Sequence, residues 1–179
     1  SENYIKNTIF EKSHSEDFVN FINSKTELEN IELMDTISDA IDVDAGKLNF
    51  INLKCKNIGN DCLDFSNSEI SGKNFFSERV QDKSISVGEG SKVEIKNLNL
   101  NNSEIAIAVK DSSEANISNI KINNSTVPFA VFVKKSEYGP AYLKVDNLIL
   151  NKSNDVFLVD KISTLEVNGK RIFGNLEGK

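Results

Sequence analysis

The sequence has few of the residues on which most catalytic and metal-binding sites depend. Among 179 residues it contains one histidine, His14, two cysteines, Cys55 and Cys62, and no tryptophan. A single histidine leaves little room for metal sites or catalytic triads, and His14 is expected to be a surface residue. Two thiols cannot form a disulfide framework, and they cannot form a structural zinc site on their own.

The low content of proline and glycine, the lack of long apolar runs and the negative charge exclude further classes of protein. Two prolines and nine glycines are few for a sandwich rich in hairpins, whose turns use these residues. No apolar run approaches the roughly 18 residues that a membrane-spanning helix needs. A formal net charge of −6 argues against a nucleic-acid partner, which requires a basic surface. At this length we expect one domain, or a piece of a larger protein.

What the sequence has in abundance is a repeat of short segments in which apolar and polar residues alternate. Pairs of apolar residues separated by one position recur every 22 residues, except that the last interval is 28. The extra residues of that interval are assigned to an inserted loop, KSEYGPA, at 135–141. The pairs are Val19/Phe21, Ile41/Val43, Leu63/Phe65, Ile85/Val87, Ile107/Val109, Phe129/Val131 and Phe157/Val159.

Two further series of pairs follow this first series in each repeat. The second series is Leu48/Phe50, Ile70/Gly72, Val93/Ile95, Ala115/Ile117, Leu143/Val145 and Leu165/Val167; the third is Ile31/Leu33, Leu53/Cys55, Phe75/Ser77, Leu98/Leu100, Ile120/Ile122 and Leu148/Leu150. A period of two predicts strands with one buried face. Each repeat therefore predicts three short strands. Only the segment EKSHSEDFVNFI, at 11–22, leaves room for a short capping helix.

An asparagine stands just before each strand of the third series. These residues are Asn30, Asn52, Asn74, Asn97, Asn119 and Asn147. Asparagine tolerates left-handed backbone geometry, and stacked amides can bond to one another. Coils stacked at the strand spacing of about 4.8 Å would bring these amides into register. The pattern predicts a tight bend and an asparagine ladder.

Three strands and about 22 residues per coil resemble the right-handed parallel β-helix of the pectate-lyase-like superfamily. We therefore expect an all-β fold, a single-stranded right-handed parallel β-helix, or solenoid, of about seven coils. The expected organisation is an N-terminal cap at 1–16, the β-helix domain at 17–173 and a C-terminal tail at 174–179. Because this fold carries lyases, hydrolases, epimerases and adhesins alike, the resemblance implies an architecture rather than one reaction.

Aspartates on the first strands form the candidate metal site. If Ile41 and Val43 point inward, Asp42, Asp44 and Asp64 point outward on one exposed sheet. Clustered carboxylates repel one another unless a cation is near, and calcium prefers oxygen ligands of this kind. The resemblance points to the same face, on which enzymes of this fold often hold calcium or paired carboxylates. The alternative is a solvated acidic face without a ligand.

Candidates for catalysis are weaker. The adjacent aspartates, Gly-His-Gly and Arg-Ile-Lys of the pectin-hydrolase-like group do not occur. A calcium-dependent lyase uses a base to take a proton α to a carboxylate, and Lys83, Lys110 and Arg79 are the basic residues expected near the aspartates. An acidic surface opposes the lowered pKa that a lysine base needs. Enzyme activity is left open, with a non-catalytic chain favoured.

Three aromatic residues near the inserted loop, Phe132, Tyr138 and Tyr142, are candidate carbohydrate contacts, because exposed rings stack on sugars. They could equally pack the loop against the coils. Glu89, Lys110 and Asp111 lie at one turn, where an ion pair between coils, such as Glu89 with Lys110, is expected; contact with a polysaccharide is the alternative.

The two cysteines are expected to remain reduced. Cys55 takes an inward position of the third series, whereas Cys62 precedes the first series and is expected to point outward.

Three functions are consistent with these features of the sequence. The first is a non-catalytic module of a larger bacterial surface- or polysaccharide-associated protein, acting as a rigid scaffold or carbohydrate-contacting surface. The second is a calcium-dependent lyase or epimerase for acidic polysaccharides, and the third is a structural solenoid that assembles end to end. An extracellular or cell-surface location is favoured, because DKSISVGEGSKVEI, at 82–95, and AVKDSSEANI, at 108–117, resemble segments of such proteins.

Overall fold

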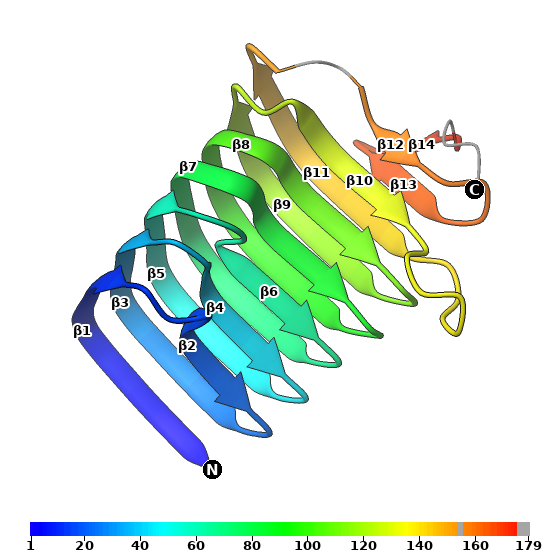
Figure 1. Ribbon diagram of the computed structural model, residues 1–179. Helices are drawn as coiled ribbons and strands as arrows, with labels where there is room; N and C mark the ends of the chain where they lie inside the picture. The colour runs from blue at the N-terminus through cyan, green and yellow to red at the C-terminus, as the bar shows by residue number, and fades with distance from the viewer. Residues whose placement is uncertain (154–155, 175–179) are drawn as a thin grey trace.

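The computed structural model describes residues 1–153 and 156–174, and in this part of the chain there are strands and turns but no helix. The strands wind around one axis into about seven stacked coils (Figure 1). They are β1 (Glu2–Ser13), β2 (Asp17–Ile22), β3 (Lys25–Thr36), β4 (Asp39–Asp44), β5 (Lys47–Ile58), β6 (Leu63–Ser66), β7 (Glu69–Gly88), β8 (Lys92–Lys110), β9 (Glu114–Asn123), β10 (Val127–Phe132), β11 (Tyr142–Asn151), β12 (Leu158–Val159), β13 (Thr164–Val167) and β14 (Lys170–Ile172).

Neighbouring coils pair in parallel and define three faces of the solenoid. We call the surface formed by β2, β4, β6, the ends of β7 and β8, β10 and β12 the first face. The longer path β1-β3-β5-β7-β8-β9-β11 turns a corner in the middle of its strands. The half before this corner is the second face, and the half after it is the third face. The fold class predicted from the sequence, an all-β parallel solenoid with coils of about 22 residues, is confirmed.

The predicted apolar series meet in register. On the first face Val19 lies opposite Ile41, and Ile41 lies opposite Leu63. Burial of these alternating side chains fills the solenoid with an apolar core that runs its whole length. At Gly72, in the second series, an added Cβ would lie 2.1 Å from the ring of Phe50. The neighbouring ring therefore fills the space that this glycine leaves inside.

The predicted asparagine ladder is present at the corner between the second and third faces. Each side-chain amide donates from Nδ2 to Oδ1 of the asparagine one coil earlier. The distances are 2.8 Å for Asn30 to Asn7, 2.7 Å for Asn52 to Asn30, 2.8 Å for Asn74 to Asn52, 3.1 Å for Asn97 to Asn74, 3.1 Å for Asn119 to Asn97 and 2.9 Å for Asn147 to Asn119. All seven adopt positive φ, between 52° and 61°, as the predicted bend requires.

The two ends of the solenoid differ. The short helix considered for 11–22 is wrong, because these residues belong to β1, a turn and β2. Residues predicted as a cap, 1–16, include β1, which pairs with β3 in parallel and continues the stack. At the other end β14 pairs with β13 in antiparallel orientation. Of the predicted tail, 175–179 lie outside the described residues.

The inserted loop lies where the change of interval placed it, between the end of β10 at Phe132 and the start of β11 at Tyr142. The buried carboxylate of Asp111 fixes it, because Oδ1 accepts hydrogen bonds from the backbone N–H groups of Lys134 at 2.6 Å and Lys135 at 2.8 Å. The Lys135 ammonium forms an ion pair with Glu89. Glu89 therefore forms an ion pair between coils, as expected at this turn, but its partner is Lys135 rather than Lys110.

Candidate functional site

The first face changes from acidic to apolar along the solenoid. One column of this face reads Asp17, Asp39, Asp61, Lys83, Ile105 and Val127; the next reads Asn20, Asp42, Asp64, Ser86, Ala108 and Ala130. Of these residues Asp61, Ser86, Ala108 and Ala130 are buried. The early coils therefore carry most of the ionisable groups of this face, and they are the part in which binding or catalysis by charged side chains would have to occur.

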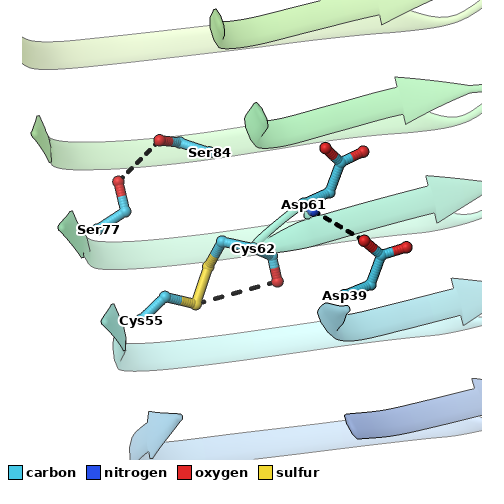
Figure 2. The surroundings of a disulfide bond; sticks show 6 residues. All are labelled: Asp39, Cys55, Asp61, Cys62, Ser77 and Ser84. Carbon is cyan, nitrogen blue, oxygen red and sulfur yellow. Dashed lines mark hydrogen bonds between the residues drawn. A yellow bond between two sulfur atoms is a disulfide. The ribbon is translucent and has the colours of Figure 1, made fainter. Parts of the chain in front are cut away.

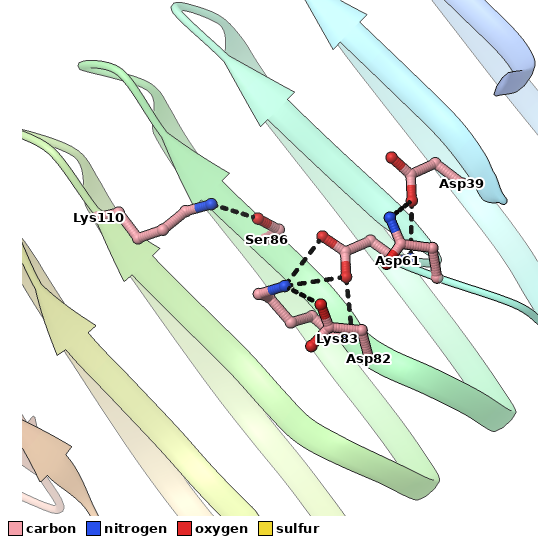
Figure 3. A network of polar contacts seen from close by, with 7 residues as sticks. Asp39, Asp61, Asp82, Lys83, Ser86 and Lys110 are labelled. Carbon is pink, nitrogen blue, oxygen red and sulfur yellow. Dashed lines mark hydrogen bonds and ion pairs between the residues drawn. The ribbon is translucent and has the colours of Figure 1, made fainter. Parts of the chain in front are cut away.

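Charged residues of the first column form hydrogen bonds and an ion pair between adjacent coils (Figure 3). Oδ1 of Asp39 accepts the backbone N–H of Asp61 at 2.8 Å and the Asn60 amide at 2.7 Å. Asp61, 4% exposed, accepts the backbone N–H of Lys83 at 2.9 Å. Each carboxylate thereby satisfies a donor of the next coil, which is a structural role.

Lys83, a candidate base, is held in the same network. Its ammonium lies 3.3 Å from Oδ1 of Asp61 and also pairs with the carboxylate of Asp82. The hydrogen bond to Asp82 and the charge of Asp61 raise the pKa of Lys83 and outweigh the opposite effect of burial. A raised pKa keeps this side chain protonated, which is the wrong state for a general base.

The other two candidate bases do not join Lys83. Lys110 reaches back across the first face and donates to Oγ of Ser86 at 2.9 Å (Figure 3). Arg79 lies at the corner between the third and first faces, where Nε donates to Asn57 at 2.6 Å and the guanidinium pairs with Glu78 at 2.7 Å. The structure therefore distributes the three basic candidates over separate contacts.

The candidate metal ligands do lie together on the first face. Asp42 and Asp64 occupy opposing positions on β4 and β6, and Asp44 opposes Ser66 one step further along. Asn20 donates to Asp42 at 3.2 Å. Yet within residues 1–153 and 156–174 no group of three or more His, Cys, Asp or Glu side chains is placed to hold a metal ion. The neighbouring carboxylates stand side by side along strands, which does not bring three of them to one point.

Burial and the charges of neighbouring carboxylates raise the pKa values of aspartates on this face. Burial raises the pKa of Asp42 to about 7, and the charges of Asp44 and Asp64 add to the rise. Burial likewise raises the pKa of Asp39, and it raises that of Asp61 to about 6 against the opposing effect of Lys83. Each of these groups favours its neutral form more than an exposed aspartate does.

The aromatic candidates lie at successive points of one coil. Phe132 ends β10 opposite Lys110, and Tyr142 begins β11 opposite Glu114. Tyr138 lies in the loop between them, where its backbone N–H donates to the carbonyl of Lys135 at 3.0 Å. All three side chains are partly exposed, so a role in carbohydrate contact stays a prediction.

The prediction for the cysteines is wrong. Cys55 and Cys62 form a disulfide inside the solenoid, and both are fully buried (Figure 2). Alternation fails at the start of the first face, where Cys62 and Leu63 point inward in succession. A partial sequence signal exists, because the equivalent residues Ala40, Ser84, Ala106 and Pro128 are small and buried, although Phe18 in the first coil is large and partly exposed.

The sequence of this chain matches no protein-family model and no curated protein. None of the described residues belongs to a helix long and apolar enough to cross a membrane.

Proposed function

We propose that this chain is a non-catalytic module of a larger bacterial surface- or polysaccharide-associated protein, built on the pectate-lyase-like plan. It acts as a rigid scaffold with a carbohydrate-contacting surface. The observation that carries this proposal is that ionisable groups of the first face form hydrogen bonds and ion pairs between coils. Asp39, Asp61 and Lys83 hold adjacent coils together, which leaves no free base beside a free acid in this column.

Rigidity follows from repeated contacts between coils. The asparagine ladder adds one side-chain hydrogen bond per coil to the backbone pairing. A buried serine column does the same, since Oγ of Ser91 accepts the backbone N–H of Ser68 at 3.0 Å and Oγ of Ser113 accepts that of Ser91 at 3.2 Å. Such a rod suits a spacer. The internal disulfide supports an extracellular place, because disulfides persist in oxidising compartments.

Two measurements test the proposal together. The purified chain is incubated with uronate polymers, and the absorbance of the unsaturated product is followed; we expect no increase. Affinity electrophoresis through gels that contain neutral or acidic polysaccharides should show retardation. Product formation that is lost in the Lys83→Ala variant would contradict the non-catalytic assignment, and mobility unchanged in every gel would contradict carbohydrate contact.

A calcium-dependent lyase or epimerase is the second candidate, and the adjacency of Asp42 and Asp64 favours it. In that case the pair and Asp44 would have to rearrange around the ion, because their present placement does not form a three-ligand site among the described residues.

End-to-end assembly is the third candidate, favoured by the outer edge of β1. Among residues 1–153 and 156–174 this strand pairs only with β3, and unpaired strand edges associate readily. Sedimentation velocity at two concentrations tests it: a sedimentation coefficient that rises with concentration supports assembly, and a constant monomer value contradicts it.

A further inference from the structure

The exposed side of the asparagine ladder borders a pocket of about 530 Å³ on the third face. Asn30, Asn52, Asn74 and Asn97 form one wall. The other is a column in which two charged residues lie between two apolar ones: Ile9, Glu32, Lys54 and Phe76. We call this pocket the ladder trough. Because its asparagines come from four successive coils, the trough runs parallel to the solenoid axis rather than along a strand.

The ladder amides retain hydrogen-bonding capacity toward solvent. A primary amide has two N–H donors and a carbonyl oxygen with two lone pairs. Within the ladder Asn52 donates to Asn30 and accepts from Asn74, which uses one donor and one lone pair. One N–H and one lone pair remain on an exposed side chain. This donor and acceptor recur at each coil, at the strand spacing of about 4.8 Å.

The opposite wall offers apolar surface with little net charge. Phe76 points outward from β7 and is partly exposed, and Ile9 is 62% exposed. The charged residues of the lining are one acid and one base, Glu32 and Lys54. Glu32 is already paired with Lys56 at 3.0 Å. Lys54 is then the one charge of the lining left over, which is too little to attract a ligand with a charge on every unit.

We propose that the ladder trough binds a neutral polysaccharide chain laid along the solenoid axis. Sugar hydroxyls both donate and accept, which matches the free N–H and lone pair of each amide. The apolar face of a pyranose ring matches the ring of Phe76, and an uncharged polymer matches a lining in which Lys54 is the one charge left over. This inference rests on the proposed carbohydrate-contacting function and gives it a location and a class of ligand.

The site lies on a different face from the aspartates, and it does not include Phe132, Tyr138 or Tyr142. The ladder therefore has two roles in one row of side chains. Bonds along the row hold the coils together, and the groups directed outward contact the ligand.

Titration calorimetry with cellohexaose, xylohexaose and mannohexaose, with hexagalacturonate as the acidic counterpart, tests the proposal. We expect at least one neutral hexasaccharide to bind, and Phe76→Ala to weaken that binding roughly tenfold through the loss of apolar contact. Ile149→Ala is the matched control, because Ile149 is an exposed apolar residue, 57% exposed, on the same third face but outside the trough. Urea unfolding of both variants confirms that each is folded.

The outcomes separate the two proposals. If the protein binds none of the four oligosaccharides, the carbohydrate-contacting function is overturned and the trough with it. If a neutral sugar binds but Phe76→Ala matches Ile149→Ala, the trough is overturned while the function stands; loss on Phe132→Ala would then place the contact near the inserted loop. Binding of hexagalacturonate alone would overturn the neutral class of ligand.

Discussion

Ser77 donates a hydrogen bond to Ser84 inside the solenoid, with 2.9 Å between the two Oγ atoms. These residues occupy the positions that Cys55 and Cys62 occupy one coil earlier (Figure 2). The same two positions are therefore connected by a disulfide in one coil and by a hydrogen bond between hydroxyls in the next. The interior accepts either connection between the third and first faces without a change of backbone path.

This equivalence predicts that the disulfide stabilises the fold without being needed to form it. In the double variant Cys55→Ser and Cys62→Ser the hydroxyls can bond as Ser77 and Ser84 do. A loop with a sequence separation of 7 leads us to expect a loss of about 2.5 kcal/mol in the free energy of unfolding. Urea denaturation of the oxidised protein and the double variant measures this difference.

Dithiothreitol supplies the control for that experiment. It should lower the stability of the parent protein by a similar amount and leave the double variant unchanged. A double variant that is unfolded in the absence of urea would show that the serine pair is no substitute for the disulfide.

The asparagine ladder predicts a difference between alanine and glycine at one position. Asn74 has a φ of 61° and makes two ladder bonds. Asn74→Ala loses both bonds and puts in the left-handed region a residue that tolerates it less well than asparagine does, so we expect a loss of about 2 kcal/mol. Asn74→Gly loses the bonds without that backbone strain and should be less destabilised. Chemical denaturation ranks the two variants.

Asn49→Ala is the matched control for the ladder. Asn49 is also exposed, but it lies within β5 away from the corner, outside the ladder, and its φ is not positive. Its replacement should change the unfolding free energy by less than about 0.5 kcal/mol. Equal losses for Asn49→Ala and Asn74→Ala would mean that the ladder does not stabilise the coils.

The coils could be predicted from the sequence because parallel stacking brings residues 22 positions apart into contact, so that each coil repeats the same pattern. The positions of Asn97 and Asn119 in the ladder follow from this spacing alone. The inward position of Cys62 could not be predicted from alternation, because the alternation of inward and outward residues stops where the chain bends before the first face. The ion pair of Lys135 with Glu89 could not be predicted either. It depends on the path of the inserted loop, which Asp111 fixes through hydrogen bonds to backbone N–H groups, and the repeat does not extend into this loop.

Ionisation on the first face predicts a dependence of stability on pH. The pKa of Asp42 rises from 3.8 to about 7 on folding, so the native state holds this proton more tightly than the unfolded chain does. Its stabilising contribution is complete below about pH 4 and is lost as the pH rises toward 7. In Asp42→Asn this part of the pH dependence should disappear, and the variant should be more stable than the parent protein at pH 8.

Thermal melts between pH 4 and pH 8 measure this effect, and Glu27→Gln is the control. Glu27 is an exposed carboxylate on the second face, so its removal should leave the pH profile of the parent protein intact. If the profile of Asp42→Asn coincides with that of the parent protein, another group is responsible for the pH dependence.

Calcium distinguishes a structural acidic face from a metal site. Because Asp42, Asp44 and Asp64 lie along strands rather than around one point among the described residues, we expect millimolar calcium to leave the melting temperature unchanged relative to sodium chloride of equal ionic strength. Screening of the carboxylates by any salt should give the same small shift in both solutions. A rise specific to calcium in the parent protein, absent in Asp64→Asn but kept in Glu27→Gln, would contradict this expectation. It would show that the aspartates rearrange around a bound ion, and it would give the lyase or epimerase alternative the metal that it requires.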